Sequence, residues 1–203
     1  MGIPVLIIGE SGSGKSASLR NFSPDEIGIF NVASKPLPFR KKIPKLDGAT
    51  YKLIEKGLSV PKLKRYAIDD SQYLLCFDMF GKAKENGYQK FTDLAVDFRN
   101  LIHNVNYALP DDVIVYFLHH TETDQNTGEI KAKTVGKMLD QYLTLEGCFD
   151  IVLYCQDHTF FTQSNNQSSA KSPEGMFELE IENNLKMVDK TIREYYGMKK
   201  GDD

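Results

Sequence analysis

Apolar and polar positions along the chain alternate between two kinds of segment, short apolar runs and longer stretches with helical spacing. An alternation of this kind is typical of a parallel sheet covered by helices on both faces. Unbroken apolar runs are typical of central strands that are buried on both sides. The pattern therefore predicts an α/β fold with a mainly parallel central sheet, and the predicted strands lie at residues 3–8, 27–30, 66–68, 113–118 and 149–155.

Helical spacing is clearest between Phe91 and Leu109, where apolar residues recur every three or four positions until Pro110. We expect shorter helices at residues 15–22 and 183–195, and another between residue 70 and the long helix. A strand pair is predicted at residues 160–162 and 176–179, around a polar loop. The stretch with Pro36, Pro38 and Pro44 predicts an extended excursion over the surface.

Length and composition favour a single domain over residues 1–203, because 203 residues with 41% hydrophobic content suit one sizeable core. No apolar stretch approaches the roughly 20 residues of a membrane span, and the first strand has no basic leader. We therefore expect a soluble, cytoplasmic protein without a membrane partner. Cys76, Cys148 and Cys155 are odd in number and lack C-x-x-C spacing, which favours reduced core thiols over disulfides or zinc.

Charge is unevenly distributed, although the net charge is only −3. The segment from Lys35 to Arg65 holds ten basic residues against two acidic ones. A basic patch on an acidic body can hold a polyanion. The equally weighted alternative is a solvated loop whose lysines serve solubility.

Candidate chemistry begins directly after the first apolar run. Residues 9–16 read Gly-Glu-Ser-Gly-Ser-Gly-Lys-Ser, which matches the phosphate-loop pattern G-x-x-x-x-G-K-[ST] between a strand and a helix start. Backbone N–H groups of such a loop surround phosphates, the lysine reaches the β and γ phosphates, and the Ser16 hydroxyl ligates Mg²⁺. The predicted nucleotide-binding residues are Gly9, Glu10, Ser11, Gly12, Ser13, Gly14, Lys15, Ser16 and Ala17.

Two carboxylates end the predicted strand at residues 66–68. After a phosphate loop, Asp69 in this place is expected to orient Mg²⁺ through a bound water. Asp70 is a candidate to polarise the attacking water. The alternative, held equally, makes Asp70 the N-cap of the next helix, a role that Ser71 also suits.

His119 and His120 end the strand that begins at Val113. Adjacent strand residues point to opposite faces, so the pair is unsuited to chelating one ion. We expect one histidine to face the nucleotide as a catalytic residue and the other to pack or cap, without choosing between them. His103 and His158 belong to no such group and are interpreted as structural.

These motifs together resemble the phage-encoded ATP-binding proteins of the RecA-like P-loop ATPase superfamily. The resemblance rests on the phosphate loop, on the strand ends at residues 68–70 and 119–121, and on the stretches Gly136–Asp140 and Ala170–Phe177. It covers nearly the whole chain, although the phosphate loop is specific only for the superfamily. Some members of the group are described as single-strand annealing or recombination proteins.

The resemblance implies a RecA-like sheet, with a strand between those of the phosphate loop and Asp69 and with a C-terminal hairpin and helix. It also implies ATP bound with Mg²⁺ at a subunit interface of a homo-oligomeric ring or filament. Single-stranded DNA would run past residues 121–134 and 156–175, in the host cytoplasm, and a phage single-strand binding protein is a further implied partner. Cations for phosphates and aromatics for stacking suit that role, namely Lys131, Lys133, Phe160 and Phe161. An ordinary hairpin with exposed lysines is the alternative.

Two further hypotheses concern the reaction itself. The chain lacks the clear catalytic glutamate of RecA, with Asp70 or a polar residue near Asn31 as substitutes, so slow hydrolysis is expected. Lys171 is predicted to reach the γ phosphate of a neighbouring subunit, since no arginine lies near a strand end of the site. A DNA-phosphate contact and a solvated lysine are the alternative roles of Lys171.

A small P-loop kinase is the second functional interpretation, although the five arginines are not clustered as a phosphoryl clamp requires. A non-hydrolysing nucleotide-binding scaffold is the third.

Overall fold

A computed structural model describes residues 1–84, 87, 89–125, 127–135, 144–164 and 168–198. Its strands form a mixed, mostly parallel sheet in the order β3-β2-β4-β5-β1-β7-β8-β9, with β6 paired to the end of β5. Strands β6, β8 and β9 join the sheet in antiparallel pairs. The strands are β1 (Ile3–Gly9), β2 (Gly28–Asn31), β3 (Lys45–Asp47), β4 (Arg65–Asp69), β5 (Ile114–Thr123), β6 (Ile130–Ala132), β7 (Ile151–Gln156), β8 (Thr159–Phe161) and β9 (Glu180–Glu182).

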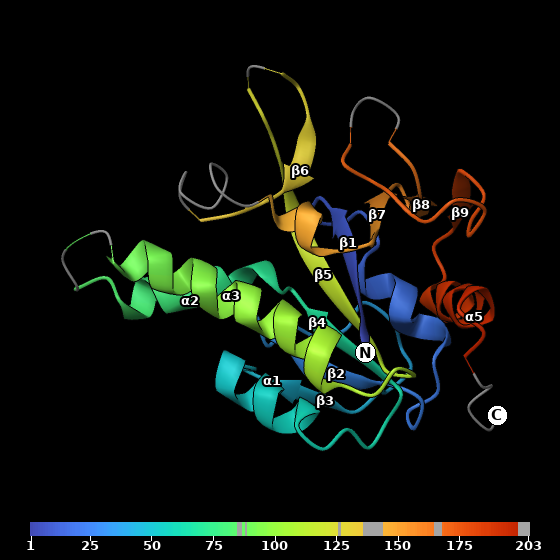
Figure 1. Ribbon diagram of the computed structural model, residues 1–203, viewed down its shortest axis with the longest axis horizontal. Helices are drawn as coiled ribbons and strands as arrows, with labels where there is room; N and C mark the ends of the chain where they lie inside the picture. The colour runs from blue at the N-terminus through green and yellow to red at the C-terminus, as the bar shows by residue number, and fades with distance from the viewer. Residues whose placement is uncertain (85–86, 88, 126, 136–143, 165–167, 199–203) are drawn as a thin grey trace.

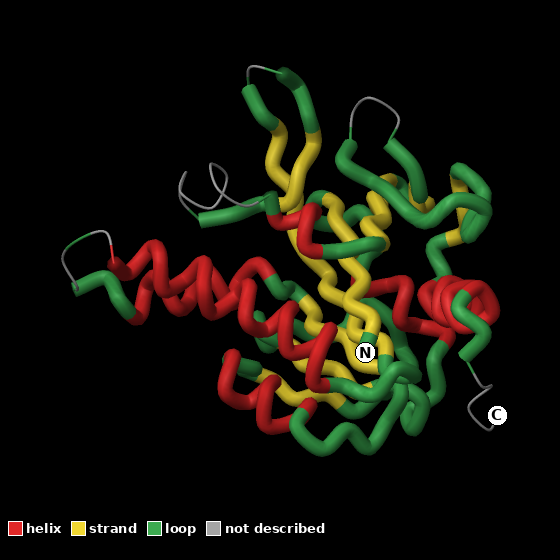
Figure 2. Tube along the Cα trace, viewed as in Figure 1, coloured by secondary structure: helices red, strands yellow, loops and turns green. Residues whose placement is uncertain are grey.

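Helices cover both faces of the sheet, as the alternating pattern predicts (Figures 1 and 2). One face packs against α1 (Tyr51–Leu58), α2 (Gln72–Gly81) and α3 (Gln89–Ala108). The other face packs against the short helix η1 (Ser16–Asn21) and α5 (Leu185–Tyr195). Successive β1 side chains alternate between the two cores, Leu6 and Ile8 in one and Val5 and Ile7 in the other. This burial on both faces confirms β1 as a central strand.

Strand β5 lies between β1 and β4, which is the inserted strand that the sequence resemblance implies. Its register pairs Ile8 with His119 and Gly9 with His120. The chain places β2, β4 and β5 on one side of β1 and β7 on the other. In open α/β sheets, ligands bind at the carboxyl ends of the strands where the chain switches sides, so this edge is where a site is expected.

Three predicted elements differ from the structure. The helix after the phosphate loop is a short 3₁₀ helix, Ser16–Asn21, and the partner of β8 is Glu180–Glu182 rather than residues 176–179. The basic segment, predicted as an extended excursion, contains β3 and α1. Helix α1 begins at Thr50, whose hydroxyl accepts a hydrogen bond from the Leu53 N–H. Its buried residues Ile54 and Leu58 lie four positions apart. Two apolar positions in a lysine-rich segment are too few for the sequence pattern to predict a helix.

The three cysteines are free thiols in the structure. Cys155 is fully buried, whereas Cys76 and Cys148 are half-buried. Within the described ranges, no helix is both long and apolar enough to cross a bilayer.

Candidate phosphate-binding site

The phosphate loop joins β1 to η1 and is held from behind by the β7 side of the sheet. Asn183 donates a side-chain hydrogen bond to the Gly14 carbonyl oxygen (3.1 Å), and the His158 N–H donates to the Ser13 carbonyl oxygen (3.0 Å). Gly14 has φ +110°, and a Cβ there would lie 2.6 Å from the His158 ring and 2.9 Å from the Asn183 amide. Only glycine suits this position, because both the backbone angle and the packing exclude a side chain.

Lys15 lies folded inside the loop and is only 5% exposed. Its ammonium donates to the carbonyl oxygens of Gly9 and Glu10, each at 2.7 Å. Burial lowers the pKa of Lys15, and the nearby Cys155 and carboxylates oppose that shift. The ammonium is thus preplaced at the mouth of the loop, with two hydrogen bonds that a phosphate oxygen can replace.

Ser16 and Asp69, the two predicted metal ligands, are in direct contact although 53 positions separate them. The Ser16 hydroxyl donates to the Asp69 carboxylate at 2.7 Å. Burial raises the pKa of Asp69, and the hydrogen bond from Ser16 opposes the rise. No cluster of three or more His, Cys, Asp or Glu side chains suited to a metal occurs in the described part of the chain. A Mg²⁺ ion on this pair would therefore take its other ligands from phosphate oxygens and water, as Mg²⁺ commonly does.

Asp70 follows at the end of β4 in a left-handed backbone conformation, with φ +59°. Its carboxylate accepts hydrogen bonds from His120 Nε2 (3.0 Å) and from Lys35 Nζ (2.9 Å). Burial alone would raise the pKa of Asp70, but these two partners outweigh it and the pKa is lowered. Ser71 is the N-cap residue of α2 and makes no side-chain capping bond, so the N-cap alternative for Asp70 is wrong.

The two histidines of β5 point to opposite faces, as strand geometry predicts. His120 faces the phosphate loop beside Asp70. His119 is fully buried, its Nε2 donates to the Lys133 carbonyl oxygen (2.8 Å), and its Nδ1 lies 2.9 Å from the Ser71 hydroxyl. Burial lowers the pKa of His119 to about 4. His119 as a catalytic candidate is therefore corrected to a packing residue, because its ring lies on the far side of β5.

A cavity of about 240 Å³ brings these groups together at the carboxyl edge of the sheet. Most of the loop from Ser11 to Ala17 lines it, together with Asp69, Asp70 and His120. Four lining residues are not predicted by the sequence analysis: Lys35, Pro36 and Pro38 from the β2–β3 connection and His158 from the β7–β8 turn. Lys35 follows the end of β2 closely, which was the available signal, but it was counted only as part of the basic segment. The contacts of His158 agree with its structural interpretation, because its N–H holds the Ser13 carbonyl oxygen of the loop that it borders.

The residues predicted to bind DNA fall into two groups. Phe160 is fully buried in the core under α5, and Phe161 packs against Tyr154 with ring centroids 6.0 Å apart. Phe160 cannot stack on a base without unfolding β8, so its predicted role is wrong. Lys131 and Lys133 lie on the β5–β6 hairpin, which extends past the sheet at the same edge (Figure 1). Lys131 pairs with Glu122 at 3.8 Å, and Lys133 is exposed.

Lys171 is not in a free loop of its own subunit. Its backbone forms a two-way antiparallel bridge with Val152 of β7, with N–O distances of 2.9 and 2.8 Å. Val152 pairs with Leu6 of β1, which lies three residues before Gly9. The Lys171 backbone is therefore set back from the start of the phosphate loop by roughly 10 Å along the strand direction. Lys171 is absent from the residues that line the phosphate cavity, and contact with a neighbouring subunit stays a prediction. Residues 136–140, part of the resemblance, lie outside the described residues.

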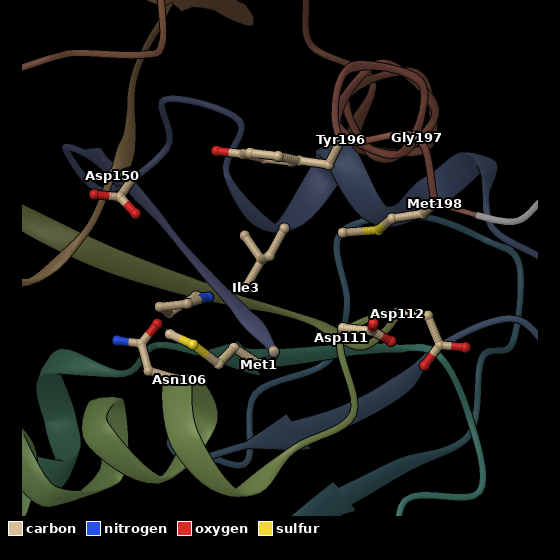
Figure 3. A pocket seen from close by; sticks show the side chains of 11 residues that line it. Met1, Ile3, Asn106, Asp111, Asp112, Asp150, Tyr196, Gly197 and Met198 are labelled. Carbon is tan, nitrogen blue, oxygen red and sulfur yellow. The ribbon is translucent and has the colours of Figure 1, made fainter.

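A larger cavity of about 740 Å³ lies at the opposite edge, around the amino-terminal ends of β1, β5 and β7 (Figure 3). Its lining includes the carboxylates of Asp111, Asp112 and Asp150 and the side chains of Tyr196 and Met198. Three carboxylates oppose an anionic ligand such as a phosphate. The smaller cavity, with its loop amides and lysines, is the one suited to a nucleotide.

Comparison with protein families and with curated proteins finds no match for this chain.

Proposed function

We propose that this protein binds ATP with Mg²⁺ at the phosphate loop and hydrolyses it slowly. The observation that carries the proposal is the 2.7 Å contact between the Ser16 hydroxyl and the Asp69 carboxylate directly beneath the loop. A hydroxyl at the end of a phosphate loop and a carboxylate at the end of a neighbouring strand hold Mg²⁺ in P-loop enzymes. The two sequence motifs thus meet where the chemistry requires them.

When bound, Mg²⁺ would offset phosphate charge between the β and γ phosphates. The loop amides and Lys15 would hold the phosphate chain, with Ser16 and Asp69 as the protein side of the metal site. Asp70 would accept a hydrogen bond from the water that attacks the γ phosphorus. Its lowered pKa makes it a weak proton acceptor, which favours orientation of the water and slow turnover.

A kinase is less well supported by the cavity. Its lining contains no arginine, although all five arginines lie in the described part of the chain. Arg65 and Arg193 pair with the buried Asp189 of α5. Without a guanidinium clamp, water is a better-supported acceptor than a second substrate.

Single-stranded DNA is the partner that we propose for the β5–β6 hairpin, in keeping with the resemblance to phage annealing and recombination proteins. The hairpin continues β5 beyond His120, so its base adjoins the nucleotide site. The Lys133 N–H donates to the His120 carbonyl oxygen at 2.8 Å. A shift of this hairpin on binding DNA would move His120 and, through their hydrogen bond, Asp70. This coupling would allow DNA to stimulate turnover in a homo-oligomer.

Ligand-dependent stability tests the nucleotide site. At about 100 times its dissociation constant, MgATP should stabilise the wild-type protein by about 2.7 kcal/mol. Lys15→Met should abolish that gain, whereas the exposed Lys42→Met should keep it. Because Lys15 is buried, each variant is compared with itself without ligand. Equal stabilisation of Lys15→Met and wild type would show that the site assignment is wrong.

Turnover separates the three functional interpretations. Hydrolysis of MgATP that rises with single-stranded DNA supports the proposed ATPase. A phosphorylated small acceptor supports a kinase, and binding without either reaction supports a scaffold.

A further inference from the structure

Lys35 places a second ammonium at the phosphate cavity, within the same subunit. It is held by its surroundings: Asn31, fully buried at the end of β2, donates through its side-chain amide to the Lys35 carbonyl oxygen at 2.7 Å. This bond fixes the backbone of the β2–β3 connection beside β4. The position of the Lys35 side chain therefore follows from the sheet and does not depend on a free loop.

The Lys35 ammonium has two further contacts at the cavity wall. It lies 2.9 Å from the Asp70 carboxylate and 4.9 Å from the centre of the Tyr73 ring on α2. The same ring packs edge-on against His120. Asp70 thus sits between Lys35 and His120, and its charge is balanced before any ligand binds. The side chain of Lys35 is still 55% exposed, so its ammonium can reach a ligand.

The balance of charge in the cavity indicates which ligand group Lys35 contacts. Lys15 and Lys35 balance Asp69 and Asp70, whereas a triphosphate with one Mg²⁺ brings a net negative charge whose terminal phosphate must lie near Asp70. Carboxylate and phosphate repel each other unless a cation lies between them. An ammonium has three donors, so Lys35 can keep Asp70 and also bind a phosphate oxygen.

Resting on the proposed nucleotide site, we infer that Lys35 contacts the γ phosphate in cis and makes the site discriminate a nucleoside triphosphate from a diphosphate. Lys35 would supply from the same subunit the cation that the sequence analysis expects from Lys171 of a neighbouring subunit. Asp70 and Tyr73 act as positioning residues for it, and Asn31 anchors its backbone.

The test compares affinities for MgADP and for the Mg²⁺ complex of the non-hydrolysable β,γ-imido analogue of ATP, by calorimetry. Lys35→Met should weaken the affinity for the analogue about 10- to 100-fold, which is the value of one hydrogen bond to a charged group. The affinity for MgADP should change less than twofold. Lys35→Arg should recover part of the loss. Lys42→Met, in the same basic segment but away from the cavity, should change neither affinity.

The outcomes are distinguishable. If wild type binds neither ligand, the proposed function fails. If wild type binds both ligands and Lys35→Met weakens both equally, Lys35 only supports the loop and the inference is overturned. Unchanged affinities in Lys35→Met overturn it as well.

Discussion

The strands on the two sides of β1 carry different kinds of residue near the phosphate loop. On the β5 side, Asp69, Asp70 and His120 turn their polar groups toward the phosphate loop. On the β7 side, Cys155 and Phe160 are fully buried, and the Cys155 thiol lies 3.3 Å from the Ser13 carbonyl oxygen at the back of the loop. Under the proposed function, the β5 side is the reactive flank and the β7 side is the packing flank, although both flanks border the same loop.

The largest expected effect tests the packing flank. Phe160→Ala should lower the free energy of unfolding by about 3–5 kcal/mol, because a fully buried ring is lost from the core under α5. Urea denaturation measures this directly. Phe161→Ala is the matched control, since Phe161 is only partly buried and should cost less. Intact stability with lost affinity for single-stranded DNA would return Phe160 to a binding role.

The next effect tests the reactive flank. Asp70→Asn should reduce MgATP turnover roughly 10²-fold, the lower end of the range for a lost general base, because Asp70 mainly orients the water. Affinity for MgADP should stay within a factor of two. Asp69→Asn is the comparison, and it should weaken the dependence of binding on Mg²⁺ concentration. Equal losses of nucleotide affinity in both variants would remove Asp70 from the reaction.

Residues at the ends of long parallel strands could be predicted from the sequence, because an apolar run fixes the strand and strand geometry fixes the edge. This reasoning placed the phosphate loop, Asp69 and Asp70 correctly at one edge. It also predicted that only one of the two β5 histidines faces the site, but not which one. That choice depends on which face α3 covers, since Phe98 of α3 packs against His119.

The errors share a physical cause, namely short elements whose position depends on distant contacts. Strand β8 has three residues, too few for a periodic pattern to reveal that Phe160 points inward. Lys35 is placed by the buried Asn31 amide and by a carboxylate 35 positions away, and only its closeness to the end of β2 gives a local signal. Lys171 is held by main-chain bonds to β7, which depend on no particular side chain, whereas its contact with a neighbouring subunit stays a prediction.

The dependence of stability on pH tests the packing role of His119 in β5. His119 stays neutral in the folded state down to about pH 4, whereas an unfolded histidine titrates near 6.5. Between these values the unfolded chain binds more protons, so stability falls as the pH is lowered. Because of His119, the free energy of unfolding should fall by about 2 kcal/mol when the pH is lowered from 7.5 to 5.

The measurement is urea denaturation at both pH values. His119→Gln should remove most of that pH-dependent difference, whereas His103→Gln, on an exposed position of α3, should keep it. An unchanged pH dependence in His119→Gln would show that the loss of stability arises elsewhere.

The smallest expected effect asks whether the reactive flank extends into the hairpin. Lys133 is exposed, and its main chain is fixed by hydrogen bonds with His119 and His120, so Lys133→Ala should leave the fold intact. If its ammonium contacts one DNA phosphate, the slope of log affinity against log salt should fall by about 0.7, the value for a single strand. Lys131→Ala should change the slope less, because Glu122 already offsets part of the Lys131 charge. If neither variant changes the slope while DNA still stimulates turnover, the strand does not follow the hairpin. The β5 flank would then serve the nucleotide alone, and the basic segment around Lys41 and Lys42 would become the next surface to test.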